Sequence, residues 1–221
     1  MKSYSLDSSI RKEVICILLV ISFLLQVPMN WLLEKCYPLV LSQTPCFEAI
    51  FSQLSIIGVE ISHISVLGIF GLLYVTFVKH LWKCKIIRRM TGVPNLEGVW
   101  TGILKTSAIN PTTGEAYDPI NMHVEITQDW NSIRIICHFK DSDSYSKTAS
   151  IQLHHPKGCV LGFSYSNESK DIMLKTREYS GYNELVYSGN YLSGFYFTNR
   201  EDGTHGIINL KREPNEKNYL Y

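Results

Sequence analysis

The 221-residue chain has few of the residue patterns that mark catalytic or metal-binding proteins. None of its six cysteines stands in a C-x-x-C arrangement, so the sequence does not predict a structural zinc site. It contains no glycine-rich phosphate-binding loop and no G-x-S-x-G turn for a nucleophilic serine. The neighbours His154 and His155 would point to opposite faces of a strand, as would Cys137 and His138. We therefore predict a protein that is not an enzyme and that uses no metal or cofactor.

The chain also lacks a strong charge of either sign, with a formal net charge of +1. Residues 1–90 contain nine lysines and arginines against five acidic residues, whereas residues 91–221 contain 12 against 15. This mildly acidic C-terminal part argues against the binding of polymeric nucleic acid through a basic face. A small anionic ligand is still compatible with it, because one or two well-placed cations are enough in a pocket.

Two long apolar runs characterise the N-terminal part. The first covers about residues 14–33, and about 20 apolar residues are enough to cross a hydrocarbon core. Arg11 and Lys12 before it would also suit a signal peptide, but no A-x-A-like cleavage site follows. The second run covers about residues 56–78. We predict two transmembrane helices within a membrane segment of residues 1–90.

The second run carries two polar residues near its start, Glu60 and His63. Their i, i+3 spacing puts them on one helix face. An interfacial polar pair and a proton relay both fit this pattern, and the sequence leaves the choice open.

Basic residues lie at the outer ends of the two runs and are nearly absent from the loop between them. Three precede the first run and five follow the second, whereas Lys35 is the single basic residue between them. The positive-inside rule therefore places both termini in the cytoplasm and a short hairpin outside. Cys36 and Cys46 in that hairpin would form a disulfide in an oxidising compartment, and two free thiols are the alternative.

After a linker at Thr91–Asn95, eight stretches alternate in polarity and are rich in β-branched and aromatic residues. They are Leu96–Ser107, Ile120–Gln128, Ser132–Phe139, Ser146–Leu153, Cys159–Ser166, Glu184–Ser188, Tyr191–Thr198 and His205–Lys211. No confident helix interrupts them. We predict two N-terminal helices followed by an all-β domain, a small up-and-down eight-stranded antiparallel β-barrel over residues 91–213 with a tail at 214–221. Closure of the barrel removes exposed strand edges and leaves room for one small ligand.

Three of these stretches have a face that begins apolar and ends with polar or aromatic groups. The faces are Leu96, Gly98, Trp100, Gly102 and Leu104; Cys159, Leu161, Phe163, Tyr165 and Asn167; and Leu192, Gly194, Tyr196, Thr198 and Arg200. This pattern predicts a barrel that is packed at one end and polar at its mouth, as in a ligand cup.

Several short motifs, in this order along the chain, resemble one bacterial family. They are Leu96-Glu97-Gly98-Val99-Trp100-Thr101-Gly102, Gln128-Asp129-Trp130, the serines Ser142, Ser144 and Ser146, Tyr165-Ser166-Asn167, and Gly194-Phe195-Tyr196-Phe197-Thr198-Asn199-Arg200. Together with two spans they are similar to the SMODS-associated two-transmembrane, β-strand-rich effectors of CBASS, the cyclic-oligonucleotide-based anti-phage signalling system.

This resemblance implies a function for each part of the chain. The barrel would bind a cyclic dinucleotide made by a cognate nucleotidyltransferase after phage infection. Binding would make the transmembrane helices oligomerise and disrupt the bacterial inner membrane, so that growth arrest blocks phage propagation. The lipid bilayer and further copies of the chain would be the other partners.

A receptor for such a ligand needs aromatic faces for two bases and donors for two phosphates. Tyr165 and Tyr196 could stack on bases, and Arg200 could bind a phosphate in a bidentate manner. Asn167 and Thr198 could contact base edges or phosphates. Ser144, Tyr145 and Ser146 could add hydroxyl groups from another strand end, and Trp100 is either a further contact or a core residue beneath the ligand.

Two other functions fit the same elements. One is a membrane-anchored, lipocalin-like barrel that binds a lipid or small apolar ligand, and the other is a structural anchor whose barrel docks protein partners. The barrel interior distinguishes the first of these from a nucleotide receptor. A polar mouth that contains Arg200 favours a nucleotide, whereas a wholly apolar cup favours a lipid.

Overall fold

The computed structural model describes residues 1–43, 65–110, 112–171, 179–200 and 203–214. The chain divides into two compact units. One contains Met1–Ser8 together with Lys83–Tyr221, and the other contains Ser9–Trp82.

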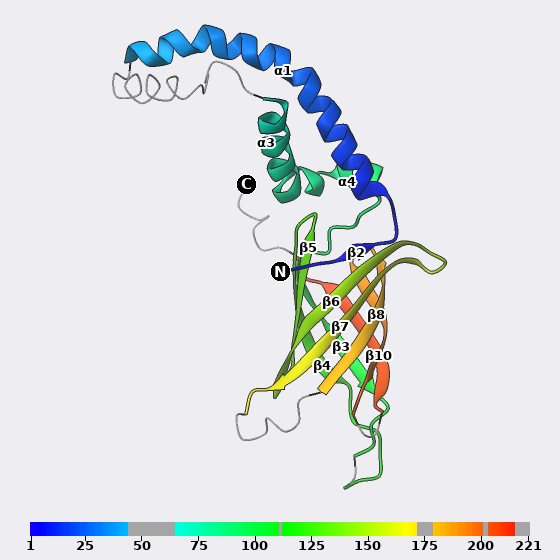
Figure 1. The fold of residues 1–221 in the computed structure, drawn as a ribbon. Coiled ribbons are helices and arrows are strands. Elements are labelled where there is room, and N and C mark those ends of the chain that lie inside the picture. Colours follow the sequence, from blue (N-terminus) through cyan, green and yellow to red (C-terminus); the bar gives the residue numbers. More distant parts are fainter. Residues whose placement is uncertain (44–64, 111, 172–178, 201–202, 215–221) are drawn as a thin grey trace. The chain divides into compact units, whose positions relative to one another are not determined.

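The unit Ser9–Trp82 contains two long helices, α1 (Ile10–Gln43) and α3 (Val66–Lys79), and η1 (Leu81–Lys83) follows at its border (Figure 1). Helix α1 begins before and ends well after the predicted 14–33, because no glycine near residue 34 stops it. Ser65 caps α3 by accepting a hydrogen bond from the amide of Gly68 at 3.1 Å.

One described helix, Ile10–Leu32, has the length and composition to cross a membrane. Helix α3 is apolar but has 14 residues, fewer than a span requires. The second predicted span is therefore not seen as such within the described residues. Residues 56–64 of that span, with Glu60 and His63, lie outside the described residues, as does Cys46.

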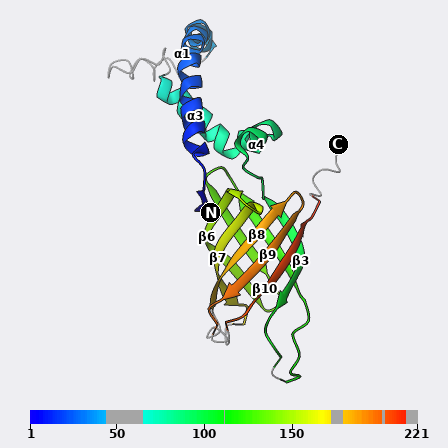
Figure 2. The ribbon, with the colours of Figure 1, turned by 90° about the vertical axis from the view of Figure 1, so that its right-hand side faces the viewer.

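The other unit is a closed antiparallel β-barrel of eight strands, as predicted. The strands are β3 (Gly98–Thr106), β4 (Ile120–Gln128), β5 (Ser132–His138), β6 (Ser142–His155), β7 (Gly158–Ser169), β8 (Tyr179–Ser188), β9 (Tyr191–Thr198) and β10 (His205–Arg212). Each strand pairs with the next along the chain, and β10 pairs with β3 to close the wall. The strands run obliquely around the barrel in Figure 2.

Two glycines make the tight turns at one end of the barrel possible. Gly158 has φ of 101° between β6 and β7, and Gly189 has φ of 60° between β8 and β9. Both values lie in the left-handed region that favours glycine. Along β5 and β9 the buried residues alternate with more exposed ones, so every second side chain fills the interior.

Large side chains fill the barrel end that receives the chain from α4 (Lys85–Thr91). Leu96, Trp100 and Trp130 are almost completely buried there. The side chain of Gln128 accepts a hydrogen bond from the amide of Leu96 at 2.7 Å and donates one to the carbonyl of Pro94 at 3.2 Å. The linker predicted after residue 90 is thus built into the barrel.

An N-terminal segment, Lys2–Asp7, also belongs to the barrel unit. Its strand β1 (Lys2–Ser3) pairs with β5, and β2 (Ser5–Leu6) pairs in parallel with β6 (Figure 1). Sequence analysis assigned residues 1–90 to the membrane part, whereas residues 1–8 and 83–90 lie in the unit that contains the barrel. Strands of only two residues, such as β1 and β2, are too short to give a recognisable alternation in the sequence.

Candidate ligand-binding site

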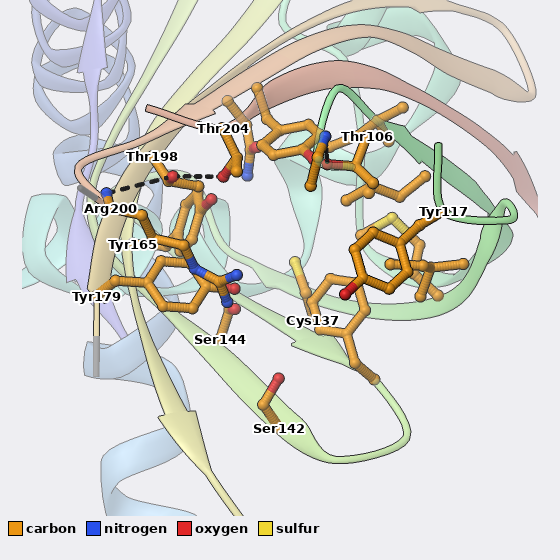
Figure 3. Close-up of a pocket in the computed structure, with 18 of the residues that line it drawn as sticks. Thr106, Tyr117, Cys137, Ser142, Ser144, Tyr165, Tyr179, Thr198, Arg200 and Thr204 are labelled. Carbon is orange, nitrogen blue, oxygen red and sulfur yellow. Dashed lines mark hydrogen bonds between the residues drawn. The ribbon is translucent and has the colours of Figure 1, made fainter. Parts of the chain in front are cut away.

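A cavity of about 310 Å³ opens at the barrel end opposite α4 (Figure 1), and Figure 3 shows residues that line it. Its walls come from the β3–β4 connection, the β5–β6 hairpin, and the adjoining ends of β7, β8 and β9. A volume near 300 Å³ lies within the usual range for small-molecule sites. Its lining combines apolar and aromatic side chains with hydroxyl groups, one carboxylate, Asp141, and two cations, Lys140 and Arg200.

Two buried tyrosines form the floor of this cavity. Tyr165 on β7 is 6% exposed and Tyr196 on β9 is 5% exposed. Each lies opposite a glycine on the neighbouring strand, Gly181 for Tyr165 and Gly206 for Tyr196. A Cβ atom at either glycine would overlap the tyrosine ring, so the missing side chains make room for the two phenols.

Arg200 is held over the cavity by its neighbours. Its guanidinium carbon lies 3.8 Å from the centroid of the Tyr179 ring, a cation–π arrangement. The hydroxyls of Thr198 and Thr204 are 2.7 Å apart, and the backbone amide of Arg200 points to Thr198 at 3.4 Å (Figure 3). The chain therefore leaves β9 with its cation fixed at the rim.

The β5–β6 hairpin supplies the opposite, hydroxyl-bearing wall. Ser142 and Ser144 both line the cavity. The hydroxyl of Ser144 donates to the side-chain oxygen of Asn167 at 2.9 Å, and both side chains are buried. Lys170 ties the hairpin to β7, because its ammonium donates to the carbonyl of Phe139 at 2.6 Å and lies 3.3 Å from Asp143.

Burial sets the protonation of the groups on the floor. It raises the pKa of the Tyr165 phenol above its ordinary value, and it also raises the pKa of Tyr196. Burial likewise raises the pKa of the Cys137 thiol to about 12. The tyrosines are therefore neutral hydrogen-bonding groups at physiological pH, and Cys137 is not activated as a nucleophile.

The structure brings together five of the nine residues that the sequence suggested as ligand contacts. Ser144, Tyr165, Tyr196, Thr198 and Arg200 all line the cavity. Their contact with a ligand stays a prediction.

The other four suggested residues lie elsewhere in the barrel. Asn167 contacts Ser144 and does not itself line the cavity. Tyr145 is exposed, because alternation along β6 turns it away from the interior. The hydroxyl of Ser146 accepts a hydrogen bond from the amide of Ile135 at 3.0 Å, within the barrel wall. Trp100 is fully buried, and its indole N–H donates to the carbonyl of Leu96 at 3.0 Å.

Sequence reasoning missed several lining residues, including Tyr179, Ser142 and Tyr117. Tyr179 was missed because the predicted strand began at Glu184, five residues late. The alternation of β8 would have revealed it, since Tyr179 pairs with Asn167 at the polar end of β7. Tyr117 lies in the connection between β3 and β4, where no periodic signal exists.

Comparison with known proteins agrees with this architecture. A family model described as the cyclic dinucleotide receptor domain of Cap15 matches residues 91–212. The CD-NTase-associated protein 15 of Yersinia aleksiciae is 32% identical over 155 residues, which cover 68% of this chain and 71% of the relative. The matched segment includes all eight strands of the barrel wall. The chain therefore belongs to the Cap15 family of CBASS effectors.

Proposed function

We propose that the barrel binds a cyclic dinucleotide at its open end and that the chain acts as a membrane effector in CBASS. The observation that carries this proposal is the Arg200–Tyr179 pair above a hydroxyl-lined cavity. A guanidinium can hold a phosphate with two parallel hydrogen bonds, and its plane can also stack on a base.

The cavity has aromatic groups on two sides, which suits a ligand with two bases. Tyr179 lies beside Arg200, and Tyr117 stands on the other side of the cavity in Figure 3. Tyr117 is 45% exposed and thus free to meet a base. The buried phenols of Tyr165 and Tyr196 then offer hydrogen bonds beneath the ligand in place of the stacking predicted for them.

The hydroxyl groups of Ser142, Ser144 and Thr204 add uncharged polar groups to the same cavity. Polar groups on several walls argue against the lipocalin-like alternative, which would need a wholly apolar cup. If a long-chain fatty acid binds and no cyclic dinucleotide does, the lipid function replaces this proposal.

Helices α1 and α3 support a location in the bacterial inner membrane. Large apolar side chains project from α1 around most of its surface, among them Phe23, Leu24 and Val27, and Leu67 and Leu72 do so on α3. Such exposed apolar surface is unfavourable in water and favourable in lipid. We propose that both helices are inserted with the termini and the barrel in the cytoplasm.

In this proposal ligand binding makes the helices of several copies assemble and disrupt the membrane. The test uses the full chain in proteoliposomes loaded with a self-quenching dye. Addition of cyclic di-AMP, cyclic di-GMP or cyclic GMP–AMP should release the dye for at least one of the three. Binding of a cyclic dinucleotide without any release would contradict the effector mechanism and leave the receptor proposal standing.

A further inference from the structure

The barrel has one incomplete seam, between β5 and β6. These strands pair directly over three residue pairs, from Ile136 with Tyr145 to His138 with Asp143. Each of the other seven neighbouring strand pairs of the described barrel has at least six pairs. The direct ladder ends at Tyr145. The next residue, Ser146, accepts a hydrogen bond from the amide of Ile135 through its hydroxyl and begins a bulge in β6.

The N-terminal segment Lys2–Asp7 closes the rest of this seam. Ser3 is the partner of Ser132 on β5, and Leu6 is the partner of Ile151 on β6. The segment therefore bridges the two strands where they diverge. It is a short insert with two residue pairs on each side.

Two side chains fasten this segment in the seam. Tyr4 is 2% exposed within the barrel core, and its hydroxyl donates to the carbonyl of Trp130 at 3.1 Å. The carboxylate of Asp7 accepts hydrogen bonds from the amides of Leu153 at 2.8 Å and His154 at 3.2 Å. Helix α1 starts at Ile10, three residues after this second anchor.

The same two strands also form a wall of the ligand cavity. Cys137 and Ser144 line the cavity and are paired with each other, directly beside the end of the ladder. Cys137 is four positions along β5 from Ile133, the partner of Lys2, or ~13 Å at the usual rise of a strand. A ligand that contacts Ser142 and Ser144 therefore acts on β6, one of the two strands between which the N-terminal segment is inserted.

From this geometry we propose that Lys2–Asp7 is a releasable latch, which lies in the seam in the resting state and leaves it when a ligand fills the cavity. The proposal rests on the proposed function and adds its regulation. Because few backbone pairs hold the segment, its release leaves the closed part of the barrel wall intact. Release frees the chain before α1 for rearrangement, while the second connection between the two units, at Trp82–Lys83, persists.

Thermodynamic linkage predicts the direction in which locking the segment changes ligand affinity. If the ligand favours the released state, a segment that cannot leave must weaken ligand binding by the factor with which the ligand promotes release. The test therefore measures ligand affinity and seam opening separately, on the full chain in detergent micelles.

A disulfide between positions 3 and 132 serves as the lock, since facing residues of antiparallel strands lie within disulfide range. Ser3→Cys/Ser132→Cys is studied oxidised and reduced, with Ser3→Cys alone as the matched control. Cyclic di-AMP, cyclic di-GMP and cyclic GMP–AMP are titrated calorimetrically, and amide hydrogen exchange is followed in residues 1–8 and 150–154.

The expected result is a lock that forms readily without ligand and weakens binding about tenfold when oxidised, with recovery on reduction. In the wild type, saturating ligand should accelerate exchange in both segments. Equal affinities of the locked and reduced forms, with unchanged exchange at saturation, would overturn the latch. Failure of the disulfide to form would overturn it as well, because the segment would not occupy the seam. A wild type that binds none of the three ligands would instead refute the proposed function.

Discussion

The guanidinium carbon of Arg200 lies 3.8 Å from the centroid of the Tyr179 ring, at the open end of the barrel. Arg200 follows the last residue pair of β9, and Tyr179 begins β8, so the two neighbouring strands bring them together. The ring orients the cation without neutralising it. An arginine held in this way is prepared for a phosphate, because less conformational freedom is lost on binding.

We predict that Arg200→Ala weakens binding of the cyclic dinucleotide by about 1.5–3 kcal/mol, the usual contribution of a hydrogen bond to a charged group. Titration calorimetry on the full chain measures this loss. Arg200→Lys is the matched control, since it keeps the charge without the bidentate fork and should recover part of the affinity. An unchanged affinity in Arg200→Ala would remove this residue from the site.

Replacement of Tyr117 tests the second aromatic side of the cavity. Tyr117→Ala should weaken binding by about 1–3 kcal/mol, because a base would lose its stacking partner. Tyr117→Phe should bind nearly as well as the wild type, since it keeps the ring. Equal losses in both variants would indicate that the hydroxyl, and not the ring, makes the contact.

Gly181→Ala should displace Tyr165 and weaken the barrel. The added Cβ would overlap both the Tyr165 ring and the carbonyl oxygen of Phe197. Overpacking of this kind usually costs about 1–3 kcal/mol of unfolding free energy. Chemical denaturation measures the cost, and the exposed Ser193→Ala on β9 is a control that should leave stability unchanged. A variant as stable as the wild type would show that the Tyr165 side chain can adopt another position without loss of stability.

Asp7 should make the docking of the N-terminal segment sensitive to acid. Burial raises the pKa of this carboxyl. Hydrogen bonds from the amides of Leu153 and His154, together with the charge of His154, lower it by more, so the net pKa lies below the ordinary value of 3.8. Its contribution to stability is thus complete above pH 3.8 and is lost as the pH falls through the pKa of the folded state.

The thermal midpoints of the wild type and Asp7→Asn, followed from neutral pH into acid, measure this effect. The wild type should be the more stable at neutral pH, and the gap should close below pH 3.8. A gap that is independent of pH would show that the charge of Asp7 does not hold the segment.

The sequence predicted the barrel well because its signal is local. Alternating polarity located the strands, and the inward faces that carry Tyr165 and Tyr196 were identified by alternation alone. Ser146 and Asn167 were assigned to the ligand because a sequence does not show which polar side chain contacts a ligand and which forms a hydrogen bond with a neighbouring residue. In the structure the Ser146 hydroxyl accepts a hydrogen bond from the amide of Ile135, and the Asn167 side chain accepts one from the Ser144 hydroxyl.

The N-terminal segment could not be predicted in the same way. Its position depends on an opening between β5 and β6 that is a feature of the complete barrel. Tyr4 and Asp7 stand just before an apolar run, and nothing in their spacing points to partners near residues 130 and 153. Long-range pairing of this kind is a property of the fold as a whole.

The most direct measurement for the central claim is calorimetric titration of the full chain in detergent with cyclic di-AMP, cyclic di-GMP and cyclic GMP–AMP. The full chain is needed because residues 1–8 complete the barrel wall. Saturable binding of at least one cyclic dinucleotide, weakened by Arg200→Ala and absent with the matching mononucleotides, is the predicted result. Failure of all three to bind a correctly folded chain would contradict the assignment of the barrel as a cyclic dinucleotide receptor.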